Sequence, residues 1–238
     1  KKNDPLLNAN IVFAKVDEPE IIAEGTCGEN VTWALTDDGT LIISGEGAME
    51  DYIRYGAPWN SYRSDITTAV IGDGVTTIGE YAFSGCTDLE SITIADSLTI
   101  IGSYAFFSCY DLAGVTIPNS VTFISEYAFA YCNGLTSITI PNGVTTIDDC
   151  AFLNCDALTS VTIGDSVTEI GQQAFSYCDA LTSVTIPVSV TTIDYGAFLD
   201  SSALETVYYG GSEKQWNKIE IGKKKRSFAE CQHRLCQG

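Results

Sequence analysis

Thiols recur at one fixed spacing along the middle of the chain, so the first chemistry to weigh is that of cysteine. One cysteine falls every 23 residues, at Cys86, Cys109, Cys132, Cys155 and Cys178, and Ser201 takes the sixth position. Repeats stacked like parallel strands would bring neighbouring Cα atoms to about 4.8 Å, within disulfide range, but would point equivalent side chains in parallel. Because cysteine also packs as a small apolar residue, the column predicts buried, unpaired thiols, with crosslinks as the alternative. Cys150 lies outside the column, and we expect it to be partly exposed.

Two other groups of residues carry ligand chemistry. A row of turn residues could offer oxygen atoms to Ca²⁺, which binds about six to eight of them. The row is Asp73, Asp96, Asn119, Asn142 and Asp165. Because Asp and Asn in turns commonly bond their own backbone, we interpret the row as structural. Near the end, Cys231, His233 and Cys236 are three possible zinc ligands, but structural zinc sites usually have a fourth and these follow a basic run at 223–226. We predict no metal and no cofactor.

Catalytic groups are scarce. No Lys, Arg or His occurs between Ser64 and Glu213, and the chain has no nucleophile-elbow, phosphate-loop or His-Glu-x-x-His motif. A glycosidase could use two carboxylates, for instance among Asp148, Asp149 and Glu169, but such pairs face each other across a cleft, which a stacked array need not form. We therefore predict that the chain is not an enzyme, and keep a carbohydrate-active enzyme as a remote alternative.

An Ala-Phe pair recurs with the same period as the cysteines and indicates the architecture. Its phenylalanines are Phe83, Phe106, Phe129, Phe152, Phe175 and Phe198. A repeat of about 20 to 29 residues cannot bury its apolar face alone, so neighbouring units must stack into one continuous core. We predict a β-rich α/β solenoid, a leucine-rich repeat of 23-residue coils. Each coil would hold short parallel strands and one short helical or 3-10 turn, with the phenylalanine pointing inward.

Alternation within each repeat predicts which strand side chains face solvent. In Leu181 to Ala203, Val184 and Ile186 alternate with Ser183 and Thr185, the period of a strand with one buried face. Stacking would align the exposed hydroxyls in two columns. The candidate binding residues on this surface are Ser137, Thr139, Ser160, Thr162, Ser183, Thr185 and Tyr208. Repeat proteins bind partners on such extended surfaces, although threonine also suits any exposed strand.

Changes of pattern divide the chain into four parts. Residues 1–20 show little periodicity and suit a leader or linker. Residues 21–65 predict an N-terminal β cap, because strand-like runs flank Thr36-Asp37-Asp38-Gly39 and Asp-Gly is typical of hairpin turns. Residues 66–209 would form about six coils, and residues 210–238 a C-terminal cap with a basic tail. Caps cover the apolar ends of solenoids.

The repeat unit is also similar to that of a known family. Its pattern L-x-x-V-x-I-P-x-S-V-T-x-I, followed by A-F-x-x-C, resembles the BspA-like leucine-rich repeat of bacterial surface proteins over about two thirds of the chain. The flanks from Thr40 to Met49 and from Val207 to Gly211 resemble those that surround such arrays. The resemblance implies export to the cell surface and binding to proteins, host matrix components among them, rather than catalysis. Residues 222–238 do not match the pattern.

Charge and hydropathy narrow the possible partners. The chain has 31 acids against 12 bases and a net charge of −19. Nucleic acids and anionic lipids are therefore disfavoured, and a cationic or neutral partner fits better. No apolar run reaches the length of about 18 residues that could span a membrane. Lys1 to Asn10 lack the apolar stretch of a signal peptide, so we expect either an intracellular protein or one whose signal is absent from this chain.

These patterns, with the export that the family resemblance implies, predict a secreted or cell-surface binding module that recognises a protein or a glycan through the exposed face of the repeat sheet. A structural spacer with no ligand of its own is the main alternative. The sequence predicts neither the ligand nor the oligomeric state.

Overall fold

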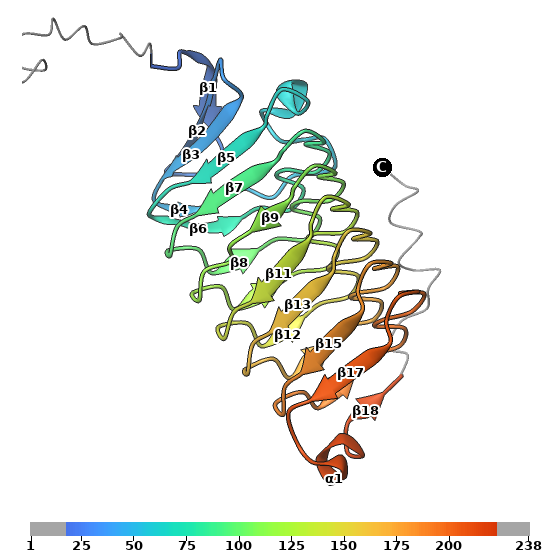
Figure 1. The fold of residues 1–238 in the computed structure, drawn as a ribbon. Coiled ribbons are helices and arrows are strands. Elements are labelled where there is room, and N and C mark those ends of the chain that lie inside the picture. The colour runs from blue at the N-terminus through green and yellow to red at the C-terminus, as the bar shows by residue number, and fades with distance from the viewer. Residues whose placement is uncertain (1–17, 223–238) are drawn as a thin grey trace, which may run out of the picture.

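The chain winds into a stack of coils. The computed structural model describes residues 18–222, which form a column with strands on two of its sides (Figure 1). Equivalent residues of successive coils lie side by side, because the step from one coil to the next equals the 23-residue sequence period. The predicted β-rich solenoid is confirmed.

One side of the column carries the longer strands. They are β5 (Thr68–Ile71), β7 (Ser91–Ile94), β9 (Gly114–Val115), β11 (Ser137–Ile140), β13 (Ser160–Ile163), β15 (Ser183–Ile186) and β17 (Thr206–Tyr209). All pairings between them are parallel, and Ser137 pairs with Ser160 as Thr139 pairs with Thr162. Within β11, Ile138 and Ile140 are buried while Ser137 and Thr139 are exposed. The alternation predicted from the sequence therefore identifies which side chains of these strands face the core.

The second side carries shorter strands in one eight-stranded sheet. They are β4 (Gly47–Ala48), β6 (Val75–Ile78), β8 (Ile100–Ile101), β10 (Phe123–Ile124), β12 (Thr146–Ile147), β14 (Glu169–Ile170), β16 (Thr192–Ile193) and β18 (Glu220–Ile221). The last isoleucine of each strand from β6 to β16 is buried. Both sheets therefore send apolar side chains into the same core.

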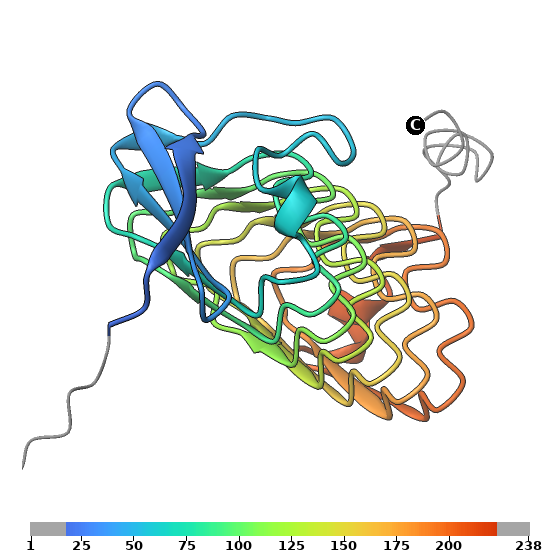
Figure 2. The ribbon, with the colours of Figure 1, turned by 90° about the horizontal axis from the view of Figure 1, so that it is seen from above.

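An antiparallel hairpin closes the N-terminal end of the column (Figure 2). Together with a preceding strand it forms a three-stranded meander of β1 (Ile21–Thr26), β2 (Val31–Thr36) and β3 (Thr40–Gly45). The turn between β2 and β3 contains the predicted Asp-Gly pair. The Asp38 carboxylate accepts the Thr36 hydroxyl (2.7 Å) and the Thr40 N–H (3.1 Å), which stabilises the turn. β3 then pairs in parallel with β5, so one sheet crosses the expected boundary at residue 65. The division into separate domains stays a prediction.

The Ala-Phe segments form consecutive turns in place of the expected helical or 3-10 turn. In the second coil, the Ala105 N–H donates to the Gly102 oxygen and the Phe107 N–H to the Tyr104 oxygen. The intervening Phe106 N–H donates instead to Ala128 in the next coil. A helix would use all these groups internally, whereas alternate donors here join coil to coil. Among the described residues, the only helical segments are η2 (Asn60–Tyr62) and α1 (Glu213–Trp216).

The repeated phenylalanines stack along the axis of the column. Centroids of adjacent rings are 5.0 to 5.4 Å apart, from Phe83 to Phe198. Trp59 continues the stack before Phe83, and its Nε1–H donates to the Ala82 oxygen at 2.8 Å. Trp33 packs edge-on against Trp59. All the phenylalanines of the stack are fully buried except Phe198, which is partly exposed in the last complete coil.

The C-terminal end of the column is less covered than its middle. Val207 is 45% exposed, whereas its equivalents Val184 and Val161 are 2% and 6% exposed. Tyr209 and Trp216 pack against each other there, with centroids 5.3 Å apart. Within residues 18–222, no helix is long and apolar enough to cross a membrane.

Candidate functional site

The exposed face of the longer strands carries the predicted candidate residues. Ser137, Thr139, Ser160, Thr162 and Thr185 are exposed. Ser183 is half-buried, and Tyr208, beside Thr185 in the ladder, is 58% exposed. Parallel pairing fixes the backbone beneath each hydroxyl, so these side chains form a regular, preformed surface.

This surface is interrupted between β9 and β11. The strands divide into a six-stranded sheet that ends at β9 and a four-stranded sheet that begins at β11. The Thr136 N–H still donates to the Ala113 oxygen at 3.3 Å, but the described strands have no ladder pairing between Gly114–Val115 and Ser137–Ile140. The sequence pattern predicts one continuous face, and the structure replaces it with two faces that meet at a gap.

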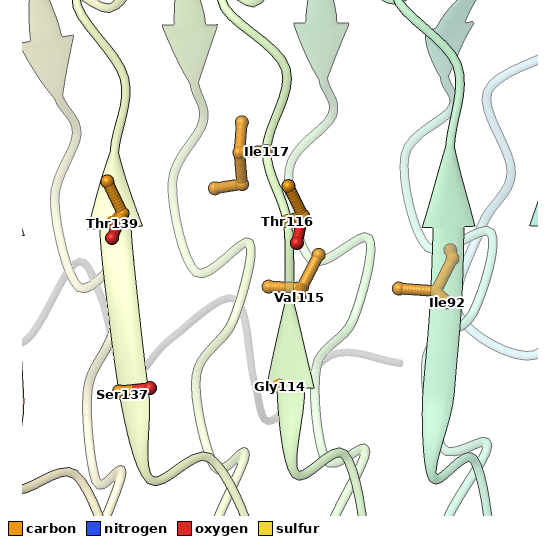
Figure 3. A pocket seen from close by; sticks show the side chains of 7 residues that line it. All are labelled: Ile92, Gly114, Val115, Thr116, Ile117, Ser137 and Thr139. Carbon is orange, nitrogen blue, oxygen red and sulfur yellow. The ribbon is translucent and has the colours of Figure 1, made fainter.

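A groove occupies the gap (Figure 3). Its volume is about 510 Å³, within the range of roughly 300–1,000 Å³ that small-ligand pockets have. Its lining combines apolar and hydroxyl side chains, namely Ile92, Gly114, Val115, Thr116, Ile117, Ser137 and Thr139. The isoleucines are nearly buried while Thr116, Ser137 and Thr139 are exposed, so the groove has an apolar floor below a polar rim.

The sequence of the third coil accounts for the gap. Gly114 takes the position that Ser91 and Ser137 hold in the neighbouring coils. Glycine weakens a strand because it has high backbone entropy and no side chain to pack, and β9 is only two residues long. A Cβ atom added at Gly114 would meet nothing within 4 Å, which shows how open the groove is at this point.

Charge around the face is of one sign. From Ser64 to Glu213 the chain has 18 acids and no base. Glu90, on the strand side of the coil before the groove, is exposed. A basic partner would be attracted to this surface, and an anionic one repelled.

The cysteine column lies inside the core. All five of its cysteines are buried and unpaired, and the thiol of each but the first donates to a phenylalanine carbonyl of the preceding coil. The Cys109 thiol, for example, donates to the Phe83 oxygen at 3.1 Å. Burial raises the pKa of the Cys86 thiol to about 12. The expected unpaired thiols are therefore present. They join neighbouring coils by hydrogen bonds and are not exposed to solvent.

Ser201 keeps the same contact in the sixth coil. Its hydroxyl donates to the Phe175 oxygen at 2.8 Å and accepts the Cys178 N–H at 3.2 Å. This position therefore suits a small side chain that can donate a hydrogen bond to the preceding coil.

The expectation of a partly exposed Cys150 is wrong. Cys150 is fully buried in a second apolar cluster on the turn side, together with Tyr104, Phe107, Tyr127 and Ala130. The buried aromatic side chains of this cluster come from two preceding coils, and the repeat pattern alone does not indicate this layer.

Three of the side chains considered for metal binding or catalysis accept backbone N–H groups. Asn142 Oδ1 accepts the Asp165 N–H at 2.8 Å, so this member of the turn row joins neighbouring coils. Asp148 accepts the N–H of Asp149, and Asp149 accepts that of Gln172 at 2.7 Å. Cys231, His233 and Cys236 lie outside the described residues.

The sequence reasoning missed a set of tyrosines on the turn side. Tyr131 and Tyr177 occupy one position of the repeat two coils apart, and Tyr110 lies near Tyr131. Tyr110 and Tyr177 are 45% and 39% exposed. The sequence does contain a sign of this set, because tyrosines recur there at a multiple of the repeat period. They lie outside the strand positions from which the binding residues were predicted.

Comparison with known families agrees with the coil geometry. The family model of a BspA type leucine rich repeat region of six copies matches residues 61–155 and 99–233. The chain belongs to the BspA-type leucine-rich repeat family. This confirms the resemblance in the repeat unit, and the family is one of repeat proteins. No curated protein matches the chain significantly.

Solved structures similar to this BspA-type chain are bacterial leucine-rich repeat proteins. One from Bacteroides ovatus is 29% identical with a TM-score of 0.60, over 75% of this chain and 51% of that protein. The T. pallidum leucine-rich repeat protein is 27% identical with a TM-score of 0.61, over 83% of this chain and 85% of that one. The chain thus spans about half the length of the Bacteroides protein.

Proposed function

We propose that this BspA-type array is a non-catalytic binding module of a secreted or cell-surface protein. Its sheet face would recognise an extended segment of a basic partner protein. The observation that carries the proposal is the groove between β9 and β11, which lies in the middle of an exposed hydroxyl-lined face and includes Ser137 and Thr139.

The groove suits one apolar side chain of a partner. Its floor is formed by the aliphatic chains of Ile92, Val115 and Ile117, and its rim offers the hydroxyls of Ser137 and Thr139 to the partner's backbone. The flanking ladders hold these groups in place before binding, so little ordering free energy would be lost.

The acidic surface favours a partner with lysine or arginine. Eighteen acids and no base lie from Ser64 to Glu213, and charge complementarity speeds encounter and excludes anionic competitors. Secretion or surface display is proposed with the function, because the family resemblance implies export.

Selection from a random-peptide display library tests the proposal without a known partner. The full chain should enrich extended peptides that carry an apolar residue flanked by Lys or Arg. Gly114→Phe should weaken binding of the enriched peptides at least 10-fold, about 1.4 kcal/mol, because the added ring fills the groove.

Thr145→Phe is the matched control, since Thr145 is exposed beside the second sheet, and it should change affinity less than twofold. Absence of saturable binding would instead favour the spacer alternative. Release of reducing sugar from polysaccharides would favour the enzyme alternative.

A further inference from the structure

The turn side of the coils carries a second aromatic layer outside the phenylalanine stack. Tyr81, Tyr104 and Tyr127 stack face to face, with centroids 4.6 and 4.7 Å apart and rings within 8° of parallel. These residues precede the Ala-Phe pairs of three successive coils, whose turns are stacked along one side in Figure 1. The layer therefore forms a rigid support beneath the surface on this side.

The position before the Ala-Phe pair has the same left-handed backbone conformation in every coil. Tyr81, Tyr104 and Tyr127 have φ values of 56° to 57°, a region that costs energy for any residue with a Cβ atom. Gly196 holds the equivalent position in the sixth coil, also at positive φ. Glycine would be the less strained residue at all of these positions.

Three further tyrosines, which we call the aromatic edge, reach the surface beside this layer. They are Tyr110, Tyr131 and Tyr177. Tyr131 is held edge-on against Phe107, with centroids 5.3 Å apart. Tyr131 and Tyr177 are two coils apart, roughly 10 Å at the strand spacing, and both have positive φ. The edge thus presents fixed rings at intervals set by the coils.

Polar groups beside these rings are also fixed. The Asp156 carboxylate accepts one amide N–H from Asn133 (3.1 Å) and one from Asn154 (2.9 Å). In the next coil, the Asp179 carboxylate accepts the Ser202 hydroxyl at 2.9 Å. The Asn133 and Ser202 bonds connect neighbouring coils and the Asn154 bond lies within one coil, so the acceptor oxygens keep their positions without a ligand.

Exposed rings and fixed carboxylate acceptors on one side of the coils match the chemistry of a sugar chain. A pyranose ring has an apolar C–H face that packs on an aromatic ring, and hydroxyls that donate to carboxylate oxygens. Sulfated or other anionic chains would be repelled, because no base lies from Ser64 to Glu213.

We propose that the aromatic edge binds a linear, neutral glycan, with Tyr110, Tyr131 and Tyr177 as stacking platforms. This surface is separate from the groove on the sheet face, and the proposal does not depend on the function assigned to that groove.

Isothermal titration of the full chain tests the proposal. The probes are three neutral hexasaccharides, from cellulose, mannan and chitin, and one heparin hexasaccharide as the anionic comparison. At least one neutral probe should bind and the heparin probe should not. Tyr110→Ala and Tyr177→Ala should each weaken that binding at least 5-fold, because each substitution removes one stacking platform.

Two controls separate this proposal from the preceding one. Tyr208→Ala removes a more exposed tyrosine from the sheet face, and Gly114→Phe blocks the groove. Neither substitution should change glycan affinity. Circular dichroism checks that each variant is folded. Failure of all neutral probes to bind, equal loss in Tyr208→Ala, or tighter binding of heparin overturns the proposal.

Discussion

Cys132 illustrates how one residue serves both packing and hydrogen bonding in this chain. Its thiol is fully buried and donates to the Phe106 carbonyl at 3.2 Å, so it joins its coil to the preceding one. A carbonyl left unpaired in the core would cost about 1–3 kcal/mol. Small size and the ability to donate a hydrogen bond together explain why serine, and not alanine, takes the place of cysteine at the end of this column.

The buried thiols predict a loss of stability at high pH. Burial raises the pKa of the Cys178 thiol from its ordinary value of 9.0 to about 12, with Asp156 and Asp179 adding to the effect. The unfolded chain therefore releases this proton before the folded chain does. The contribution to stability is fully present below pH 9 and is lost as the pH rises through about 12.

Urea unfolding between pH 9 and pH 12 measures the effect. Cys178→Ser should reduce the slope of the unfolding free energy against pH by up to about 1.4 kcal/mol per pH unit, the value for one proton. Ser201 shows that serine fits this position, so the variant should fold. An unchanged slope would contradict the assigned role of the thiol.

At the scale of elements, the short strand β9 decides where the binding face is divided. It has two residues where β7 and β11 have four, and the sheet ends at it. One glycine in one repeat thus changes a surface that the other repeats build uniformly. The proposed groove arises from this departure from the repeat and not from the repeat itself.

Gly114→Ser should extend the ladder and stabilise the protein by about 0.5–1 kcal/mol, because it restores the serine of the neighbouring coils and lowers the backbone entropy of the unfolded chain. It should also narrow the groove. Gly79→Ala is the matched control. Its Cβ atom would run into the Glu50 carbonyl oxygen, so it should destabilise the protein by about 1–3 kcal/mol.

Urea midpoints of the two variants, read against the parent chain, give both values. A loss of stability in Gly114→Ser would mean that the gap has another cause than the missing side chain.

At the scale of the whole molecule, charge of one sign is distributed along the column. The net charge is −19, and the coils between Ser64 and Glu213 carry no base to offset their acids. Such self-repulsion opposes the compact state and is weakened by salt. The column therefore holds together through its apolar core against its own surface charge.

The melting temperature should rise by roughly a few degrees between 0.01 M and 0.3 M NaCl. The triple variant Asp73→Asn, Asp96→Asn and Asp165→Asn should melt higher at low salt and gain less from added salt. Asn119 and Asn142 already occupy this row, so the substitutions suit the turns. A melting temperature that falls with salt, or a variant that behaves like the parent, would argue against repulsion as the cause.

The repeat made much of the architecture predictable. Phe129 and Leu135 stand at positions that recur in every coil, and a position that is apolar in every coil must face the common core. The same logic predicted the exposed hydroxyls of Thr139 and Thr162, since strand alternation leaves them no inward direction. The local turn geometry was less predictable, because the donors of the Ala-Phe segment are shared with the next coil.

The sequence by itself determined the period, the inward residues and the acidic surface, because these depend on spacing and composition alone. Only the tertiary structure decided the division of the sheet at Gly114, the burial of Cys150 and the assembly of Tyr110, Tyr131 and Tyr177 into one edge. Each of these is set by contacts between neighbouring coils, where a departure from the repeat in one coil changes what its neighbours can cover. Both proposed binding surfaces lie at such departures.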